Sequence, residues 1–297
     1  MALLKIQFFV CFVFLSSIAS MPRQVAAQGL FSQMKKDIRS QSVSNETTKK
    51  KEKNRSSESY DDTYSNQDCD NPFSEIFGVV ILSTVTAPWS IPILAAEDDY
   101  ESAGYFPGYP YQDDLSGYIM VDRLSQHESI GSEPYPYSTQ SSTDYTHYSD
   151  EISKIGTRFL IDTTSRFGID SEFSYWEESL PGGLRENFWS GDTNVLFRFA
   201  QSESVQMRTG IGFNWLSDDI GSDFGFNFTY KGDFFPIDPV IISAELDLGK
   251  IGSAALTHVR ITTGVNWRHA EIFVGYDHLR LGETELDGLI GGLRIWF

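Results

Sequence analysis

The last twelve residues of the chain alternate strictly between two kinds of side chain. One row is apolar and carries no charge: Leu289, Gly291, Leu293, Ile295 and Phe297. The other row is mixed and includes a cation: Gly288, Ile290, Gly292, Arg294 and Trp296. Successive side chains of a β-strand point to opposite faces of the sheet. We therefore predict a strand with one apolar face and one face that admits charge.

The same alternation runs through residues 153–297, which we predict to form one antiparallel up-and-down β-barrel. Short polar breaks divide the region into eight segments, at about 156–177, 192–201, 204–216, 222–232, 239–249, 254–269, 270–281 and 285–297. The first segment is long enough to be a hairpin with its turn at residues 164–166. Its apolar row nevertheless continues across that turn without a change of phase, so we interpret the segment as one long strand. We thus expect eight strands, which enclose an interior just wide enough for side chains.

The apolar rows predict that the barrel faces lipid. In the later segments these rows contain no charged residue, as in Phe224, Phe226 and Phe228. A cation at the middle of a bilayer costs roughly 2–4 kcal/mol, so a charge-free row is what lipid requires. A strand of about eleven residues tilted by about 45° is about 25 Å tall, which matches the apolar band of membrane barrels. The alternative is a soluble, calycin-like barrel that keeps its apolar row inside and binds a hydrophobic ligand.

The opposite face of the predicted barrel carries charges of both signs. The proposed interior network consists of the cations Arg158, Arg166, Arg198, Arg208, Lys231, Arg260, Arg268 and Arg294 and the anions Asp162, Asp170, Glu172, Glu245, Asp247, Glu271 and Asp277. The two signs nearly balance on this face, although the whole chain has a net charge of -18. Buried charges have to be paired. We therefore expect an enclosed network of ion pairs and no wide diffusion pore.

The ending of the chain resembles the C-terminal strand of bacterial outer-membrane β-barrels, in which a terminal Phe preceded by apolar residues forms the insertion signal. Here the corresponding residues are Leu289, Leu293, Ile295 and Phe297. The resemblance extends to the class and to no particular member. It implies a location in the bacterial outer membrane, with the N-terminal extension in the periplasm. It also implies outer-membrane lipid and the barrel assembly machinery as partners.

Three segments precede the predicted barrel. Residues 1–27 are predicted to be a signal peptide, because Lys5 precedes a short apolar run and small residues follow it. Residues 28–70 are polar, and we expect them to be a disordered linker. Residues 71–152 are predicted to be an irregular segment rich in Tyr and Pro, with one apolar element at 77–96. Pro88 and Pro92 interrupt that element, so we expect it to pack on the protein or lie at a membrane surface rather than to span a membrane.

No motif in the sequence indicates catalysis, a cofactor or a metal site. The acidic balance argues against nucleic acid as a partner, because binding to phosphates requires basic patches. Some outer-membrane barrels that remove acyl chains from lipid A use a His-x-Ser pair on a lipid-facing strand. One such pair here, at His147 and Ser149, lies outside the predicted barrel. We therefore expect a non-enzymatic protein with a structural, anchoring or narrow-pore role, and a lipid-modifying enzyme is the alternative. The sequence leaves the oligomeric state open.

Overall fold

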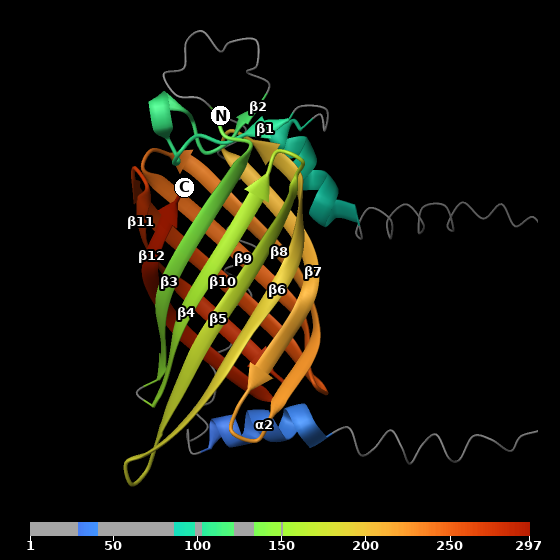
Figure 1. Ribbon diagram of the computed structural model, residues 1–297, viewed down its shortest axis with the longest axis vertical. Coiled ribbons are helices and arrows are strands. Elements are labelled where there is room, and N and C mark those ends of the chain that lie inside the picture. Colours follow the sequence, from blue (N-terminus) through green and yellow to red (C-terminus); the bar gives the residue numbers. More distant parts are fainter. Residues whose placement is uncertain (1–28, 41–85, 99–102, 122–133, 150) are drawn as a thin grey trace, which may run out of the picture.

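The chain folds around a closed antiparallel barrel of ten strands (Figure 1). The structure is a computed structural model that describes residues 29–40, 86–98, 103–121, 134–149 and 151–297. The barrel strands are β3 (Tyr137–Ser149), β4 (Ile152–Thr163), β5 (Phe167–Leu180), β6 (Leu184–Ser202), β7 (Val205–Ser217), β8 (Ser222–Ile237), β9 (Val240–Ile251), β10 (Ala254–Trp267), β11 (Ala270–Leu281) and β12 (Thr284–Trp296). Each strand pairs with its neighbours in sequence, and β12 pairs with β3 to close the barrel.

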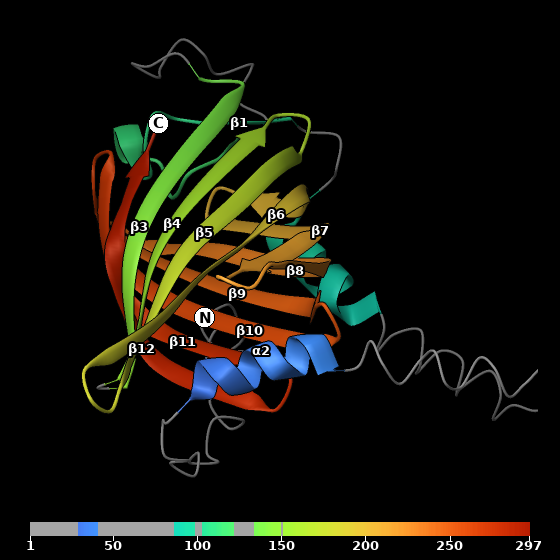
Figure 2. The ribbon, with the colours of Figure 1, turned by 60° about the horizontal axis from the view of Figure 1, so that its bottom comes forward.

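The described parts of the N-terminal extension lie at the two mouths of the barrel and on its outer wall. Helix α2 (Leu30–Ser40) lies across the mouth opposite Phe297 (Figures 1 and 2). A second helix, residues 86–96, lies beside the wall near the other mouth. The short strands β1 (Gly104–Tyr105) and β2 (Met120–Val121), with the 3₁₀ turn η1 (Gln112–Asp114) between them, cover the mouth at Phe297. Within the described ranges, no helix is both long enough and apolar enough to cross a membrane.

The expected count of eight strands is wrong, in part because the segment 156–177 is a hairpin. Strand β4 ends at Thr163 and β5 begins at Phe167, which leaves a turn of three residues. Directly opposed residues of an antiparallel pair lie on the same face. A turn with an odd number of residues joins partners of equal parity, such as Asp162 and Gly168. The apolar row therefore keeps its phase through the turn, so an unbroken phase does not distinguish a hairpin from a long strand.

The other added strand is β3, which lies in the segment that we expected to be irregular. The barrel therefore begins at Tyr137 rather than at residue 153. The outward row of β3 is rich in hydroxyl groups and the inward row is polar too, so the strand lacks the hydrophobic alternation that marks the others. It is held by backbone pairing with β4 on one side and β12 on the other.

Helix α2 is a second ordered element, within the segment 28–70 that we expected to be disordered.

Two stretches between the predicted segments, 178–191 and 233–238, belong largely to strands. The stretch from 178 to 191 continues the β5–β6 hairpin, whose turn is formed by residues 181–183. Gly182 and Gly183 have φ values of 87° and 79° there, a backbone conformation that a side chain disfavours. This hairpin extends beyond the rest of the barrel (Figure 1). The stretch from 232 to 238 lies largely within β8, so the barrel has no long loop there.

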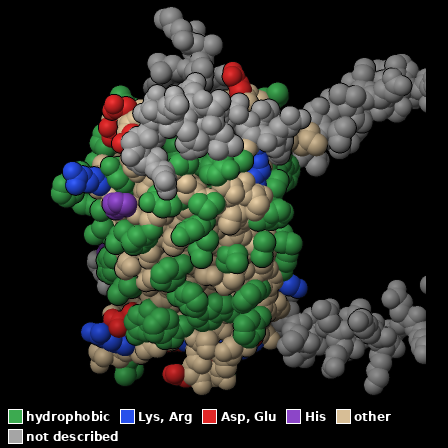
Figure 3. Space-filling view, turned by 45° about the horizontal axis from the view of Figure 1, so that its top comes forward, with side chains coloured by type: hydrophobic (Ala, Val, Ile, Leu, Met, Phe, Trp, Pro, Cys, Tyr) green, Lys and Arg blue, Asp and Glu red, His purple; other side chains and the backbone are tan. Residues whose placement is uncertain are grey.

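The apolar rows point away from the barrel axis, as lipid contact requires. Ile211 is 60 % exposed, Val265 56 % and Leu289 72 %. Hydrophobic side chains spread over the wall in Figure 3, whereas charged side chains lie toward its two ends. The ion pairs Arg185–Glu177 and Arg280–Glu285 are examples at the α2 end. This orientation is the reverse of the one that a calycin-like barrel needs.

We predict that Ile211→Arg destabilises the barrel in a bilayer by roughly 2–4 kcal/mol, because Ile211 lies in the middle of the outward row of β7. Ile220→Arg is the matched control, since Ile220 is 79 % exposed in the β7–β8 turn beyond the apolar wall. The measurement is denaturant unfolding of the protein folded into phospholipid vesicles, followed by heat-modifiable gel migration. Equal tolerance of both substitutions would contradict the assignment of the wall to lipid.

Candidate functional site in the barrel lumen

A core of ion pairs crosses the lumen at mid-height. Arg158 of β4 pairs with Glu172 of β5, and its Nη1 lies 2.5 Å from Oε2 of Glu245 on β9. Arg260 of β10 donates to both oxygens of Glu172, at 3.1 and 3.2 Å. Strands β4 and β5 lie across the barrel from β9 and β10 in the order of the sheet. These ion pairs therefore tie opposite walls together.

A second group extends the core toward the mouth at Phe297. Lys231 of β8 pairs with Asp170 and lies 2.8 Å from Glu245. Arg208 of β7 donates to Asp162 of β4 at 2.7 Å and to Asp233 of the neighbouring strand β8 at 2.6 Å. Asp233 is not among the predicted residues, because it lies between the predicted segments 222–232 and 239–249.

A third group extends the core toward α2. The imidazole of His258 lies 3.1 Å from a carboxylate oxygen of Asp247 and 3.1 Å from one of Asp277. Arg260 Nε donates to Asp277 at 2.9 Å, and the Tyr148 hydroxyl donates to it at 2.6 Å. Lys154 Nζ also lies 3.4 Å from Asp277. Lys154 is not among the predicted residues, because it precedes the first predicted segment, which begins at about residue 156.

Two members of the predicted network lie elsewhere. Arg166 is in the β4–β5 turn, where its two terminal nitrogens each lie 2.7 Å from a carboxylate oxygen of Asp98, next to helix 86–96. Arg268 is in the two-residue turn between β10 and β11, exposed and with a φ of 57°. Both residues were counted as strand, but they lie in turns, where the alternation of faces no longer applies. The other predicted members point into the lumen, including Arg198, which lies 3.5 Å from Asp162, and Arg294, which lies 3.0 Å from Glu271.

The mouth at Phe297 is closed by an aromatic cluster. Tyr118 packs edge-on against Trp296 with 4.5 Å between the ring centroids, and its hydroxyl lies 2.6 Å from the Ser138 hydroxyl. Phe106 and Phe235 complete the cluster, and all four rings are buried. Burial raises the pKa of Tyr118, which keeps the phenol neutral. Trp296, from the inward row of the last strand, therefore joins the barrel to its cap.

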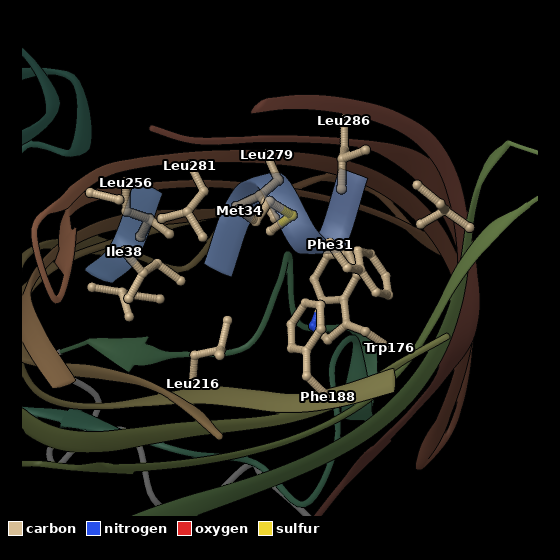
Figure 4. Packing of buried hydrophobic residues seen from close by; sticks show 13 residues of the cluster. Phe31, Met34, Ile38, Trp176, Phe188, Leu216, Leu256, Leu279, Leu281 and Leu286 are labelled. Carbon is tan, nitrogen blue, oxygen red and sulfur yellow. The ribbon is translucent and has the colours of Figure 1, made fainter. Parts of the chain in front are cut away.

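The opposite mouth is closed by the apolar face of α2. Phe31, Met34 and Ile38 follow the spacing of one helix face and point into the barrel (Figure 4). Phe31 packs edge-on against Phe188 with 4.7 Å between the ring centroids. Trp176 in turn stacks on Phe188. The remaining wall of this apolar cup is aliphatic and comprises Leu216, Ile251, Leu256, Leu279, Leu281 and Leu286. An isolated helix of this length is marginal in water, so α2 depends on the mouth for its order.

Carboxylates around the rim hold α2 in place. Glu178 accepts hydrogen bonds from the backbone N–H groups of Leu30 and Phe31, both at 3.0 Å, at the positive end of the helix. Lys35 Nζ lies 2.6 Å from Glu186, and Arg39 lies 2.9 Å from Asp218. Burial alone would raise the pKa of Asp218. Hydrogen bonds from Arg39 and from the backbone N–H groups of the β7–β8 turn outweigh burial and lower that pKa to about 2.

Among the described residues, two small cavities of about 50 and 60 Å³ lie in the lumen. Arg158 and Arg260 line the first cavity, whereas their partner Glu172 lines the second, below Met34. The ion pairs therefore stand between the two cavities. Each has room for a few water molecules at most. Side chains of the described residues therefore fill most of the lumen.

The described residues contain no group of three or more His, Cys, Asp or Glu side chains placed to hold a metal ion.

The His-x-Ser pair is not outside the barrel as expected, because His147 and Ser149 belong to β3, with His147 on its outward row. Two strands away, His278 Nδ1 lies 2.7 Å from Asp287, to which the Tyr276 hydroxyl also donates. Cys11 and Cys69 lie outside the described residues, as do the predicted signal peptide and most of the predicted linker.

Comparison with known proteins finds similarity in structure only. No protein-family model matches the chain, and no curated protein matches it. Among solved structures, the chain is similar to the outer membrane protein Ail of Yersinia pestis in a phospholipid bilayer nanodisc, with 12% identity, 54% of this chain and 99% of that chain covered, and a TM-score of 0.31. It is also similar to Neisserial surface protein A (9%, 55% and 97%, TM-score 0.30) and to the KdgM porin (11%, 53% and 99%, TM-score 0.29). Identities and TM-scores this low assign no function.

We predict that Glu172→Gln destabilises the barrel by about 3–5 kcal/mol, because it leaves two buried guanidinium groups without a shared counter-charge. The matched control is Glu177→Gln in the same strand, whose partner Arg185 is 67 % exposed. An exposed pair contributes about 0–1 kcal/mol. Urea unfolding of both variants in vesicles measures the difference. Similar losses for both would show that the lumen network is not a major source of stability.

We also predict that acid releases α2. The hydrogen bond from Arg39 of α2 helps to lower the pKa of Asp218. The stabilisation of the docked helix by this carboxylate is therefore complete above about pH 4, the ordinary pKa of Asp, and is lost as the pH falls toward 2. A nitroxide at Lys36→Cys, in a Cys11→Ser and Cys69→Ser background, should become mobile over that range. Asp218→Asn removes this titrating carboxylate, so the change in label mobility over that range should be smaller in the variant. A label whose mobility does not change between pH 7 and pH 2 would contradict the prediction.

Proposed function

We propose that the protein is a closed, non-catalytic barrel of the bacterial outer membrane that anchors its N-terminal extension in the cell envelope. The observation that carries this proposal is the filled lumen, in which ion pairs cross between opposite walls and both mouths are covered. Such an interior has no continuous aqueous path for a solute. An interior cross-braced in this way suits a rigid anchor better than a porin.

The proposed partners are outer-membrane lipid and the barrel assembly machinery. Lipid is supported by the apolar outer wall. The assembly machinery is supported by the C-terminal strand, where Leu289, Leu293, Ile295 and Phe297 are all exposed on the outward face. Because β12 also forms the closing pair with β3, a factor that recognises this strand would act where the barrel closes.

We place the mouth at Phe297 on the periplasmic side, by analogy with bacterial barrels of this class. Residues 86–98 and 103–121 of the extension, which lie at that end, would then be periplasmic. The sequence alone predicts that the whole N-terminal extension lies in the periplasm. Helix α2 lies at the opposite mouth, however, so we do not include α2 in this placement.

We predict that the full-length protein gives no discrete conductance steps in a planar bilayer. The double variant Phe31→Asp, Met34→Asp should release α2 and still leave the lumen closed, because the ion pairs below the helix remain. A path for ions should open only when Arg158→Ala, Glu172→Ala and Arg260→Ala are added together with Tyr118→Ala, which removes part of the aromatic seal at the Phe297 mouth. Steps in the α2 variant alone would instead identify a narrow pore that α2 gates.

A second candidate is an outer-membrane enzyme that modifies lipid, and the position of His147 favours it. His147 lies on the outward row of a strand, and Ser149 follows two residues later, where a serine and a base could meet an acyl ester. The test is mass spectrometry of lipid A from cells that express the protein or its His147→Ala or Ser149→Ala variant. We expect no difference between protein and variants. Loss of acyl chains that depends on both residues would replace the anchor proposal.

A further inference from the structure

The helix at residues 86–96 packs against the outer wall of the barrel, on a surface that faces lipid in the function proposed above. Trp89, Ile93 and Ala96 contact a patch formed by Phe197, Phe199, Ala200, Val205, Met207, Tyr230 and Phe234. The Tyr230 hydroxyl donates to the backbone oxygen of Pro88 at 2.5 Å. Figure 1 shows the helix in teal beside the upper part of the wall, near β7 and β8.

The face of this helix that points away from the barrel is also apolar. Ile91 is 57 % exposed and Leu94 is 76 % exposed. No residue from 86 to 96 carries a charge, and the first acidic residues, Glu97 and Asp98, follow immediately. A helix that is apolar on every side belongs in an apolar surrounding. The barrel supplies that surrounding on one side only.

The end of the helix is fixed to the rim of the barrel. Asp98 accepts from both terminal nitrogens of Arg166 at 2.7 Å and from the backbone N–H of Gln201 at 2.9 Å. Arg166 and Gln201 lie in the β4–β5 turn and near the end of β6, at the mouth where Phe297 lies. The described part of the apolar helix therefore lies on the wall and ends at the polar rim.

We propose that residues 86–96 form an interfacial membrane helix, with Ile91 and Leu94 inserted among the acyl chains of the leaflet at the Phe297 mouth. This inference rests on the proposed membrane location of the barrel. The ligand is the phospholipid bilayer itself, because the exposed face of the helix continues the apolar wall without a charged residue between them. The Asp98–Arg166 pair holds the helix at the depth where hydrocarbon gives way to headgroups.

The test measures the surroundings of residue 94 in the full chain. A nitroxide is attached at Leu94→Cys, with Cys11→Ser and Cys69→Ser, and the protein is folded into phosphatidylcholine vesicles. Collisions with oxygen, which concentrates in hydrocarbon, are compared with collisions with a water-soluble nickel chelate. The controls are Ile211→Cys on the outward wall and Asp113→Cys on the exposed cap.

We expect the label at residue 94 to behave like that at residue 211, accessible to oxygen and protected from nickel, and unlike that at residue 113. Accessibility to nickel at residue 94 with protection at residue 211 would overturn the inference and leave the barrel proposal intact. Protection from both reagents, or spin–spin broadening between labels, would also overturn it, because a protein surface or a second copy would then cover the helix. Accessibility to nickel at residue 211 would instead refute the membrane location on which both proposals rest.

Discussion

Backbone pairing between β12 and β3 is the interaction on which the other features depend. It joins residues 289–296 to residues 140–147 and leaves no free edge in the sheet. In hydrocarbon an unpaired edge would expose N–H and C=O groups that nothing could satisfy. Closure also separates two surroundings, so that each strand has one face toward the wall exterior and one toward an enclosed lumen. Both the apolar belt and the ion pairs follow from that separation.

The enclosed lumen explains why its charges are so tightly matched. Side chains such as Glu172 and Asp277 are almost completely buried, and each contacts more than one cation. A single unpaired charge in such a place would cost far more than a surface pair contributes. The mouths follow a different principle, because each is sealed by apolar and aromatic packing, Trp296 at one end and Phe31 at the other. Polar bracing in the middle and apolar seals at the ends make the interior a single filled unit.

Sequence alone predicted the class of fold, the outward rows and most of the lumen network, because alternation over many residues fixes which face each side chain takes. It failed where alternation carries no information. The turn at residues 164–166 preserved the phase, so a hairpin was counted as one strand. Strand β3 has polar residues on both faces, and only its pairing with β4 and β12 defines it. Helix α2 was missed because its order comes from the cup that it fills, and the residues that form the cup are remote in sequence.

The pairing of β12 with β3 determines when the barrel can close during synthesis. Strand β3 is the first barrel strand to leave the ribosome, and its partner β12 is the last. The cylinder therefore cannot close until the whole barrel sequence has been synthesised, and until then β3 has a free edge that can pair with other chains. Such an edge invites aggregation. That edge is removed only when the first and last strands of the barrel pair with each other.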